Sequence, residues 1–546
     1  MTDLRNTLYT PDHQLRAVLL LLMTVTLLVY AAGFFNGFLR DDELIIVNNP
    51  QTLSLRNIPD VLFAPDVVKP YYRPLNRATY LLDYRIAGMN PAWYHGVNIL
   101  LHGGNVILLY LLCCRLFPDR TAALIAALLF AAHPANSEAV NFISARNTLL
   151  ALFFSLASLL AFTRARDEGR RWPVVPALLF FLGLLSKETA FMLIAIIALY
   201  TVIPLPGHEG RKQGRDRFVA LIPYVIATLM YFAMRAYALR DLVGTSVPAA
   251  GLLDRLSQNI TIIPQYLALL FVPVDLTIYH TADPQSGFIS LPGAVPAVWL
   301  AAAAGIWWLL RTGDRATRFG LVWCVVNYAP ISNIIPIPSD QIQERFLYMP
   351  AVGFFIAVGS ILSITDARKR WPSRYWIAAA AVLIAFAGLT VQRSLDWKDE
   401  FTLITSGVRN DPASVPAHYN LGTALRERGD LAGALREWQR ALELDPRDSD
   451  SLIQMGTYSA MQGDLRKAEE YYDAALRAPR GIADPEKSMA YFNLGKIRDQ
   501  QGQPQQALEH YERFLKIVPL QYEEYRAYAE RRVAQLRGDA ARGRGK

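Results

Sequence analysis

Three consecutive carboxylates, Asp41, Asp42 and Glu43, stand in the stretch FLRDDELIIVNNP, shortly after a long apolar run. A carboxylate near other charges can act as a general base that removes a proton from an attacking hydroxyl. Asp41 is our candidate base, with Asp42 beside it to tune its pKa. A solvated acidic loop in which Arg40 pairs with the carboxylates is the plainer alternative. Charge close to a bilayer is costly, which favours a functional interpretation.

Basic side chains that could bind a phosphate occur in four separate motifs: Arg73, Arg146, Lys187 and Arg345. A single displacement at a sugar carbon needs one base and no second acid if the leaving group is a phosphate, because a phosphate departs without a proton. Each cation also has a structural alternative as a snorkelling side chain or as the partner of a local carboxylate. The nearest such pairs are Lys187 with Glu188 and Arg345 with Glu344.

Histidines at helical spacing suggest packing rather than metal binding. His95, Asn98 and His102 share one helix face, which favours a buried, hydrogen-bonded contact. A metal held by His95, His102 or His133 with the aspartates is the weaker alternative, because no compact ligand spacing is present. We therefore predict no metal and no cofactor. The three cysteines, Cys113, Cys114 and Cys324, lie in apolar segments and are expected to be packing residues.

The composition predicts a membrane protein with many spans. Of the 546 residues, 53% are hydrophobic, and they form several long apolar runs. The first run leads into the acidic loop and not into a small-residue cleavage site, so we expect a retained helix rather than a signal peptide. The net charge of +8 comes largely from short loops between spans, so nucleic-acid binding is not expected.

Four basic segments mark the cytoplasmic side: 164–171, 210–217, 311–318 and 366–374. A cytoplasmic N-terminus then gives eleven spans and an extracytoplasmic C-terminus. The predicted spans are 15–35, 94–115, 119–134, 139–163, 173–187, 188–205, 218–237, 292–310, 319–336, 346–364 and 375–392. The apolar run 260–272, within the segment 258–273, is interpreted as re-entrant or interfacial, with a twelfth span as the alternative. In this topology the motifs RDDE, HPANSE, SKE and QERFLYMP all end on the extracytoplasmic side.

The chain changes character after about residue 395, where long apolar runs stop. Leu421-Gly422, Met455-Gly456 and Leu494-Gly495 each begin a pattern of Ala, aromatic and Pro residues that is typical of 34-residue tetratricopeptide repeats. The third unit begins five residues late, and the stretch APRGIADPE is expected to hold the insertion. The predicted domains are a membrane domain 1–394, a linker 395–411, repeats 412–536 with a cap helix 522–536, and a disordered tail 537–546.

Several blocks together resemble a known family, the transmembrane and tetratricopeptide-repeat O-mannosyltransferases of the GT-C fold. The blocks are FLRDDELIIVNNP, YYRPLNRATYLLDYRIAGMNPAWYHGVNILLH, HPANSEAVNFISARNTLLAL, LLSKETAF and QERFLYMPAVGF. The resemblance implies an all-α, polytopic membrane domain followed by a repeat solenoid, with a polyprenyl (dolichyl) phosphate sugar as donor. It makes Asp41 and Asp42 the catalytic pair. The positions that match the other polar blocks, as donor-phosphate or substrate ligands, are Arg73, His133, Glu138, Arg146, Lys187, Glu188, Arg345 and Tyr348.

The chain departs from the family pattern in three ways. Glu43 extends the acidic pair, Asn136 stands where a second histidine is expected, and three repeats are fewer than eukaryotic members carry.

The leading hypothesis is an inverting glycosyltransferase that moves mannose or another hexose from a polyprenyl-phosphate carrier. The acceptor would be a protein hydroxyl or a glycan, presented by the repeat groove on the extracytoplasmic face of a membrane such as a bacterial inner membrane. Two alternatives remain open. One is a ligase or polymerase of lipid-linked oligosaccharides, and the other is a non-enzymatic scaffold in which a membrane anchor carries the repeats.

Overall fold

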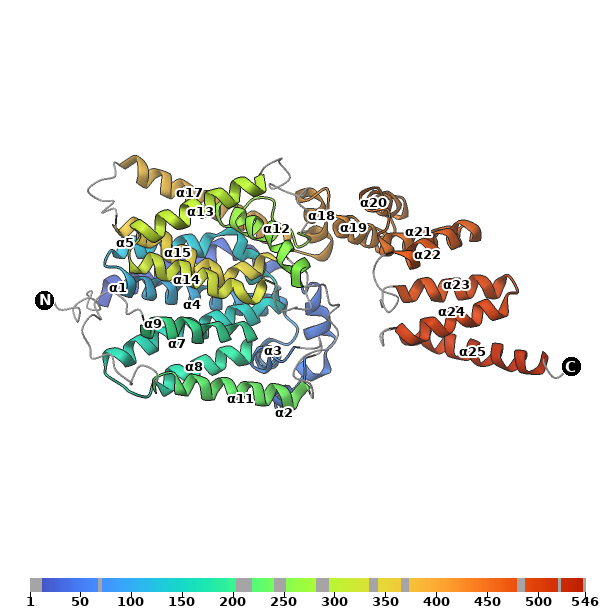
Figure 1. Ribbon diagram of the computed structural model, residues 1–546, viewed down its shortest axis with the longest axis horizontal. Coiled ribbons are helices and arrows are strands. Elements are labelled where there is room, and N and C mark those ends of the chain that lie inside the picture. Colours follow the sequence, from blue (N-terminus) through green and yellow to red (C-terminus); the bar gives the residue numbers. More distant parts are fainter. Residues whose placement is uncertain are drawn as a thin grey trace. The chain divides into compact units, whose positions relative to one another are not determined.

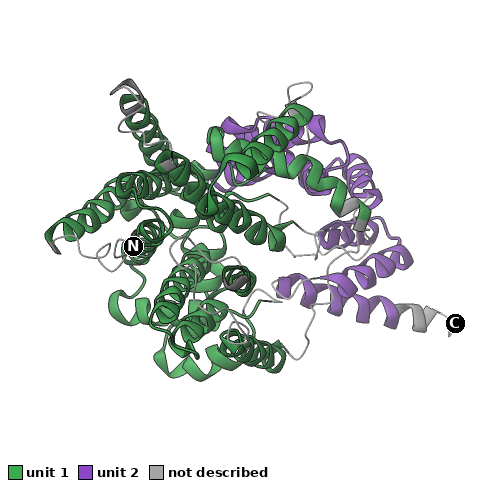
Figure 2. Ribbon diagram, turned by 60° about the vertical axis from the view of Figure 1, so that its left-hand side comes forward, with its two compact units in different colours: residues 1–403 green, residues 404–546 purple. Residues whose placement is uncertain are grey.

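The structure is a computed structural model that divides into two compact units, residues 1–403 and 404–546 (Figure 2). The division falls inside the segment predicted as a linker. The described residues are 12–66, 71–202, 219–239, 252–280, 294–332, 342–364, 373–478, 487–518 and 522–543. Within these ranges every regular element is a helix, which agrees with the predicted all-α class. The basic segment 210–217 and most of 366–374 lie outside the described residues.

Long apolar helices run roughly side by side through the first unit (Figure 1). The longest, α4, has 26 residues and is about 39 Å long, which is enough to cross a bilayer. The helices of this unit are α1 Asp12–Val29, α2 Ile58–Phe63, α3 Pro74–Ala87, α4 Pro91–Leu116, α5 Arg120–Ala132, α6 Ser137–Asn141, α7 Arg146–Asp167, α8 Val174–Ser186, α9 Met192–Val202, α11 Ile222–Leu239, α12 Leu252–Phe271, α13 Ala294–Thr312, α14 Arg315–Tyr328, α15 Tyr348–Ile364 and α17 Ser373–Asp396. A further helix, α18 Glu400–Asn410, begins in this unit and ends in the second.

The span count is supported only in part. Within the described residues, six helices are long and apolar enough to cross a membrane, or seven if α5 and the segment Pro134–Asn141, bent by 54°, form one broken span. Three of the predicted spans correspond to shorter apolar helices, His13–Val29, Val174–Ser186 and Glu188–Tyr200. Eleven spans therefore remain a prediction. The segment predicted as re-entrant forms α12, which carries Pro264 in its interior and is not among the six.

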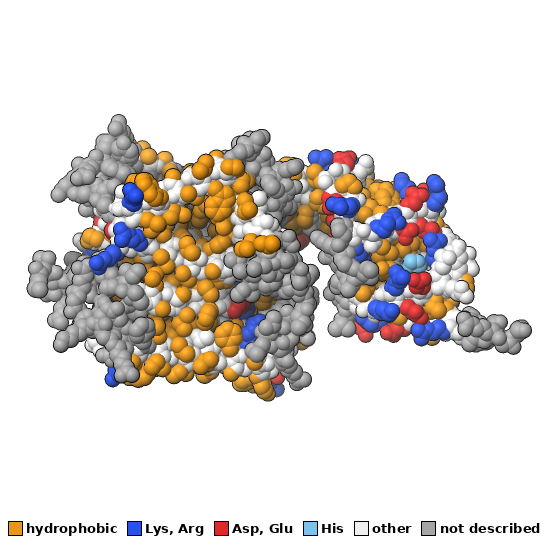
Figure 3. All heavy atoms as spheres, in the orientation of Figure 1, with side chains coloured by type: hydrophobic (Ala, Val, Ile, Leu, Met, Phe, Trp, Pro, Cys, Tyr) orange, Lys and Arg blue, Asp and Glu red, His pale blue; other side chains and the backbone are white. Residues whose placement is uncertain are grey.

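Burial separates inner from outer helices in the first unit. In the apolar segments that contain α7 and α15, 67% of each segment is buried inside the protein, whereas 0% of the α13 segment is buried. Figure 3 shows a face of this unit that is covered largely by hydrophobic side chains, with few charged ones. Such a surface suits contact with lipid hydrocarbon, while α7 and α15 can position polar side chains inside the protein.

Pairs of antiparallel helices form the second unit. Its helices are α19 Val415–Glu427, α20 Leu431–Leu444, α21 Ser449–Met461, α22 Leu465–Arg477, α23 Ser488–Gln500, α24 Pro504–Ile517 and α25 Glu523–Gly543. Aspartates cap three of them: Asp430, Asp448 and Asp464 accept hydrogen bonds from Gly433 N, Ser451 N and Lys467 N at 2.8, 2.9 and 3.0 Å. The residues described here thus contain the three predicted helix pairs.

Helices occupy most of the segment predicted as a linker, since α17 continues to Asp396 and α18 occupies 400–410. One predicted boundary differs from the structure. The cap helix is present as α25, but it continues to Gly543 into the segment predicted as disordered. Ala and Arg residues at its end are good helix formers, which accounts for the extension. The insertion predicted at APRGIADPE lies, apart from its first residue, outside the described residues.

A glycine in each repeat lets two helices approach closely. A Cβ atom on Gly456 would lie 2.8 Å from Cε1 of the buried Tyr472, and one on Gly495 would lie 2.8 Å from Cε1 of Tyr511. We expect Gly456→Ala to destabilise the repeat unit by about 1–3 kcal/mol and to lower its melting temperature by about 4–12 °C. Resistance of the repeat helices to protease during heating measures this change.

Gly538 provides a matched control. It also lies inside a helix, but no atom is within 4 Å of the place where its Cβ would stand. Gly538→Ala should therefore leave the melting temperature unchanged or raise it, because alanine is the better helix former. An equal loss in both variants would contradict the packing argument.

Candidate functional site

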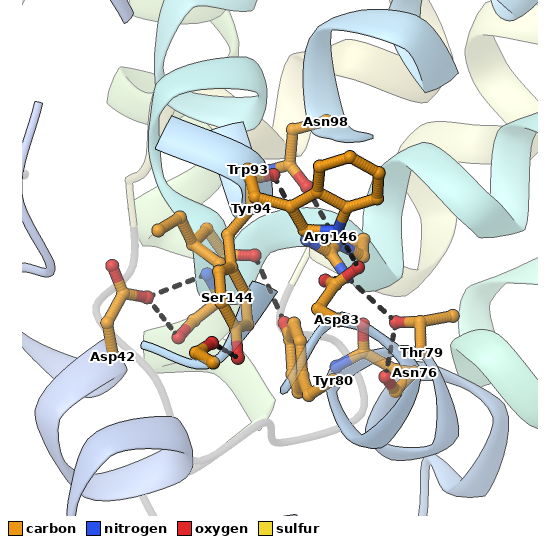
Figure 4. A network of polar contacts seen from close by, with 12 residues as sticks. Asp42, Asn76, Thr79, Tyr80, Asp83, Trp93, Tyr94, Asn98, Ser144 and Arg146 are labelled. Carbon is orange, nitrogen blue, oxygen red and sulfur yellow. Dashed lines mark hydrogen bonds and ion pairs between the residues drawn. The ribbon is translucent and has the colours of Figure 1, made fainter. Parts of the chain in front are cut away.

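The two neighbouring aspartates of the acidic loop have opposite environments. Asp41 is exposed, whereas Asp42 is buried with 1% of its surface accessible. Asp42 accepts hydrogen bonds from Leu39 N at 3.1 Å, from Ser144 N at 2.8 Å and from the Ser144 hydroxyl (Figure 4). Burial raises the pKa of Asp42 to about 7, against the lowering effect of these hydrogen bonds. Of the two aspartates, only Asp41 is exposed to solvent.

The residue before Asp41 has an unusual backbone. Arg40 has φ 53°, in the left-handed region, and Asp275 is the other described non-glycine residue with a positive φ. Arg40 N donates to Glu400 Oε2 at 3.2 Å, and the Arg40 guanidinium lies 5.6 Å from the centroid of the Tyr279 ring. These contacts hold Arg40 in this conformation directly before the exposed Asp41.

Three of the predicted cations lie together with two carboxylates, and we call this group of five residues the cation cluster. Arg73 forms a two-point ion pair with Glu188, with distances of 2.7 and 3.1 Å. Arg345 pairs with Glu138 and also donates its backbone N–H to Glu138 Oε2 at 2.9 Å. The charges of all four residues act on Lys187, whose Nζ donates to Thr148 Oγ1 at 2.8 Å.

Tyr71 links the cation cluster to the acidic loop. Its ring lies 4.0 Å from the Arg73 guanidinium, and the charges of Arg73, Glu188, Arg345 and Asp41 all act on it. Burial is the largest cause of a raised Tyr71 pKa. The exposed Asp41 and the cation cluster are thus parts of one polar site.

The local ion pairs considered from the sequence are not the ones that form. Glu188 pairs with Arg73 rather than with its neighbour Lys187, and Glu344 contacts His280 at 3.2 Å and Arg393 at 3.7 Å rather than Arg345. Each main pair joins segments far apart in the sequence, so the folded chain, and not local spacing, selects the partners.

Arg146 does not belong to the cation cluster, and the prediction that it binds donor phosphate is not supported by its surroundings. Its side chain is fully buried and pairs with Asp83. It also donates to Asn98 Oδ1 at 2.8 Å, to Thr79 Oγ1 at 3.1 Å and to the Tyr94 carbonyl at 3.0 Å (Figure 4). With four protein acceptors and no exposure, this guanidinium acts as a structural centre.

His133 and Tyr348 also lie in the protein core. His133 Nε2 is 3.1 Å from the Leu270 carbonyl, and its ring packs edge-on against Phe355 and Phe386. The Tyr348 hydroxyl lies 2.7 Å from His102 Nδ1. Since His102 Nε2 faces the Ala131 carbonyl at 3.3 Å and must donate to it, Nδ1 accepts from Tyr348. These contacts of both residues are with the protein core and not with the cation cluster.

The buried helix face predicted on α4 is confirmed. His95 Nε2 contacts the Gly37 carbonyl at 3.2 Å, and Asn98 donates to the carbonyls of Val140 and Phe142 at 3.2 and 3.3 Å. Within the described ranges, no group of three or more His, Cys, Asp or Glu side chains could hold a metal ion. A metal-free site remains a prediction.

Sequence reasoning missed two residues of the site, Tyr71 and Ser144. Tyr71 stands two residues before Arg73, and this spacing of an aromatic and a cationic residue could have indicated their contact. Ser144 carried no such signal, because its partner Asp42 is 102 residues away.

Comparison with known proteins supports the resemblance noted in the sequence. Residues 84–236 match the family model for dolichyl-phosphate-mannose-protein mannosyltransferase, and residues 415–448 and 448–519 match tetratricopeptide repeat models. Protein O-mannosyl-transferase TMTC3 of Mus musculus is 25% identical over 552 residues, which cover 91% of this chain and 60% of that protein. Protein O-mannosyl-transferase F38B6.6 of Caenorhabditis elegans is 27% identical over 446 residues, or 78% of this chain and 63% of that protein.

The chain spans about six tenths of the length of these curated relatives. The match to the mannosyltransferase model falls on the first unit, and the repeat matches fall on the second. These findings support a similarity to a tetratricopeptide-containing, O-mannosyltransferase-like family.

Proposed function

We propose that this protein is an inverting glycosyltransferase that moves mannose or another hexose from a polyprenyl-phosphate carrier to a hydroxyl of a protein or glycan. The observation that carries the proposal is the exposed carboxylate of Asp41 beside the cation cluster. The match to a mannosyltransferase model and the printed names of the relatives support a mannosyl donor.

In the proposed reaction, the acceptor oxygen attacks C1 of the sugar while Asp41 takes the hydroxyl proton. The bond between C1 and the phosphate oxygen breaks as the new glycosidic bond forms, which inverts the configuration at C1. The leaving phosphate keeps its negative charge and is held by the cations of Arg73, Lys187 and Arg345. No second protonated side chain is needed.

Arg73, Lys187 and Arg345 can together bind the phosphate of the carrier. The acidic loop, in which Asp41 is exposed, argues against the alternative of an oligosaccharide ligase or polymerase. A purely structural scaffold would not require an exposed base beside these cations.

The membrane orientation and the role of the repeats complete the proposal. The basic segments of the sequence favour an extracytoplasmic position for the acidic loop, for example at a bacterial inner membrane. The tetratricopeptide groove would present the acceptor, since repeats of this kind form concave binding surfaces.

Replacing the base tests the proposal directly. We expect Asp41→Asn to lower sugar transfer by about 100- to 10,000-fold, because the amide cannot accept the acceptor proton. Glu43→Gln is the matched control. Glu43 is also exposed, and its substitution removes one negative charge from the same loop. Transfer from a purified polyprenyl-phosphate mannose measures both. Wild-type turnover in Asp41→Asn would refute the base assignment.

Lys187 tests the phosphate site without leaving a buried carboxylate unpaired, because its direct hydrogen-bond partner is the neutral Thr148. Lys187→Gln should weaken donor binding by about 2 kcal/mol, or about 30-fold in KM, since hydrogen bonds to charged groups are worth about that much. Lys496→Gln, an exposed lysine of the repeat unit, controls for the lost charge. An unchanged KM in Lys187→Gln would remove this residue from the donor site.

The repeats are tested by deleting residues from 412 onward. If the groove presents the acceptor, transfer to the natural acceptor should fall far more than background hydrolysis of the donor. Both rates are measured on the same purified, truncated protein. Undiminished transfer with purified components would mean that the repeats recruit a partner instead, and equal loss of both rates would mean that the membrane domain had been damaged.

A further inference from the structure

The turn that carries Asp41 is held in a conformation that its sequence does not favour. Arg40, with φ 53°, is in a region that costs a non-glycine residue free energy, so neighbouring contacts must maintain it. On one side of Asp41, Arg40 N donates to Glu400. On the other side, Asp42 is bound to Ser144 through two hydrogen bonds. The exposed Asp41 lies between these two anchored residues.

Ser144 is itself firmly placed. It lies in the short helical turn Ile143–Ala145, directly before α7. The carbonyl of Ile143 accepts a hydrogen bond from the Tyr80 hydroxyl at 3.0 Å, and Arg146 forms the buried pair with Asp83 (Figure 4). Residues on both sides of Ser144 are therefore fixed to α3. A donor fixed in this position can restrain the acidic loop through Asp42.

We propose that Ser144 is a positioning residue for sugar transfer, which through Asp42 fixes the turn Arg40 to Asp42 so that the Asp41 carboxylate faces the cation cluster. The inference rests on the proposed role of Asp41 as the base. It also assigns Asp42 a role different from that of its neighbour: Asp42 anchors the turn and does not touch the reacting atoms. A general base must lie within hydrogen-bond reach of the acceptor proton, so a small displacement of the turn is costly to the rate.

Two substitutions at Ser144 distinguish the effect of its hydroxyl group from the effect of changing the size of the side chain. Ser144→Ala keeps the backbone donor to Asp42 but removes the hydroxyl donor, and we expect kcat to fall about 10- to 100-fold with KM for the donor unchanged. Ser144→Thr keeps a hydroxyl and should restore most of kcat. Ser158→Ala is the matched control, because Ser158 is also buried and donates to the Pro176 carbonyl at 2.7 Å, away from the acidic loop. It should retain wild-type kcat.

The double variant shows whether Ser144 acts through Asp41. In the Asp41→Asn background, Ser144→Ala should lower residual transfer no further, since no base remains to be positioned. The melting temperature of each full-length variant is measured in parallel. A further loss in the double variant, or the same kcat loss in Ser158→Ala, would mean that Ser144 acts on general stability and would overturn the inference.

The pH profile gives a second readout. The ionisable groups that act on Asp42 are Asp41 in its own loop and Tyr80 on α3. The Ser144 hydroxyl lowers the pKa of Asp42, so its removal should raise that pKa above the value of about 7. Protonation weakens the carboxylate as an acceptor, so the loss of kcat at low pH should begin at a higher pH in Ser144→Ala. An unshifted profile would count against the proposal.

The outcomes distinguish this inference from the proposed function. If Asp41→Asn abolishes transfer but Ser144→Ala and Ser144→Thr both behave as wild type, the base assignment stands and the positioning role is wrong. If Asp41→Asn transfers sugar at the wild-type rate, the proposed function fails first, and the inference fails with it.

Discussion

The start of α7 depends on one buried ion pair, between Arg146 and Asp83. Burial of a guanidinium costs free energy unless its N–H groups donate to acceptors. Here Asn98, Thr79 and the Tyr94 carbonyl are those acceptors. These acceptors come from α3 and α4, so a single side chain fixes the relative placement of three helices. The turn before α7 is held next to this ion pair, and Ser144 in that turn donates to Asp42 of the acidic loop. A buried charged residue is thereby connected, through Ser144 and Asp42, to the loop that carries the exposed carboxylate.

Helical periodicity and composition were enough to predict the class of the fold and the repeats. The buried face of α4 followed from the spacing of His95, Asn98 and His102, and the helix pairs of the second unit followed from the recurrence of Gly and aromatic residues. The number of spans did not follow in the same way. Several predicted crossings form helices such as α8, with 13 residues, which are shorter than a bilayer requires when taken alone.

The sequence predicted which polar motifs form the site but not which of their residues form ion pairs with one another. Arg73 and Glu188 are 115 residues apart, and Glu138 and Arg345 are 207 apart, so neither pair can be read from local spacing. Local spacing instead suggested pairs of adjacent residues, and those pairs do not form. Arg146 was grouped with the other cations because it stands in a similar block. Its partners separate it from them: Arg146 meets Asp83, Asn98 and the Tyr94 carbonyl, which the packing of α3, α4 and α7 brings together.

The acidic loop shows why two identical neighbours can have different roles. Asp41 and Asp42 have the same side chain and follow one another in the chain, but successive residues of a tight turn point in different directions. They follow directly on Arg40, whose φ of 53° lies in the left-handed region. Asp42 faces three donors and is fixed by them, while Asp41 remains exposed within the influence of Arg40 and Tyr71. An anchored carboxylate restrains the turn because its oxygens are already engaged, and for the same reason it is poorly suited to take a proton from an acceptor. The free carboxylate has the accessibility that base catalysis needs but depends on its neighbour for its position.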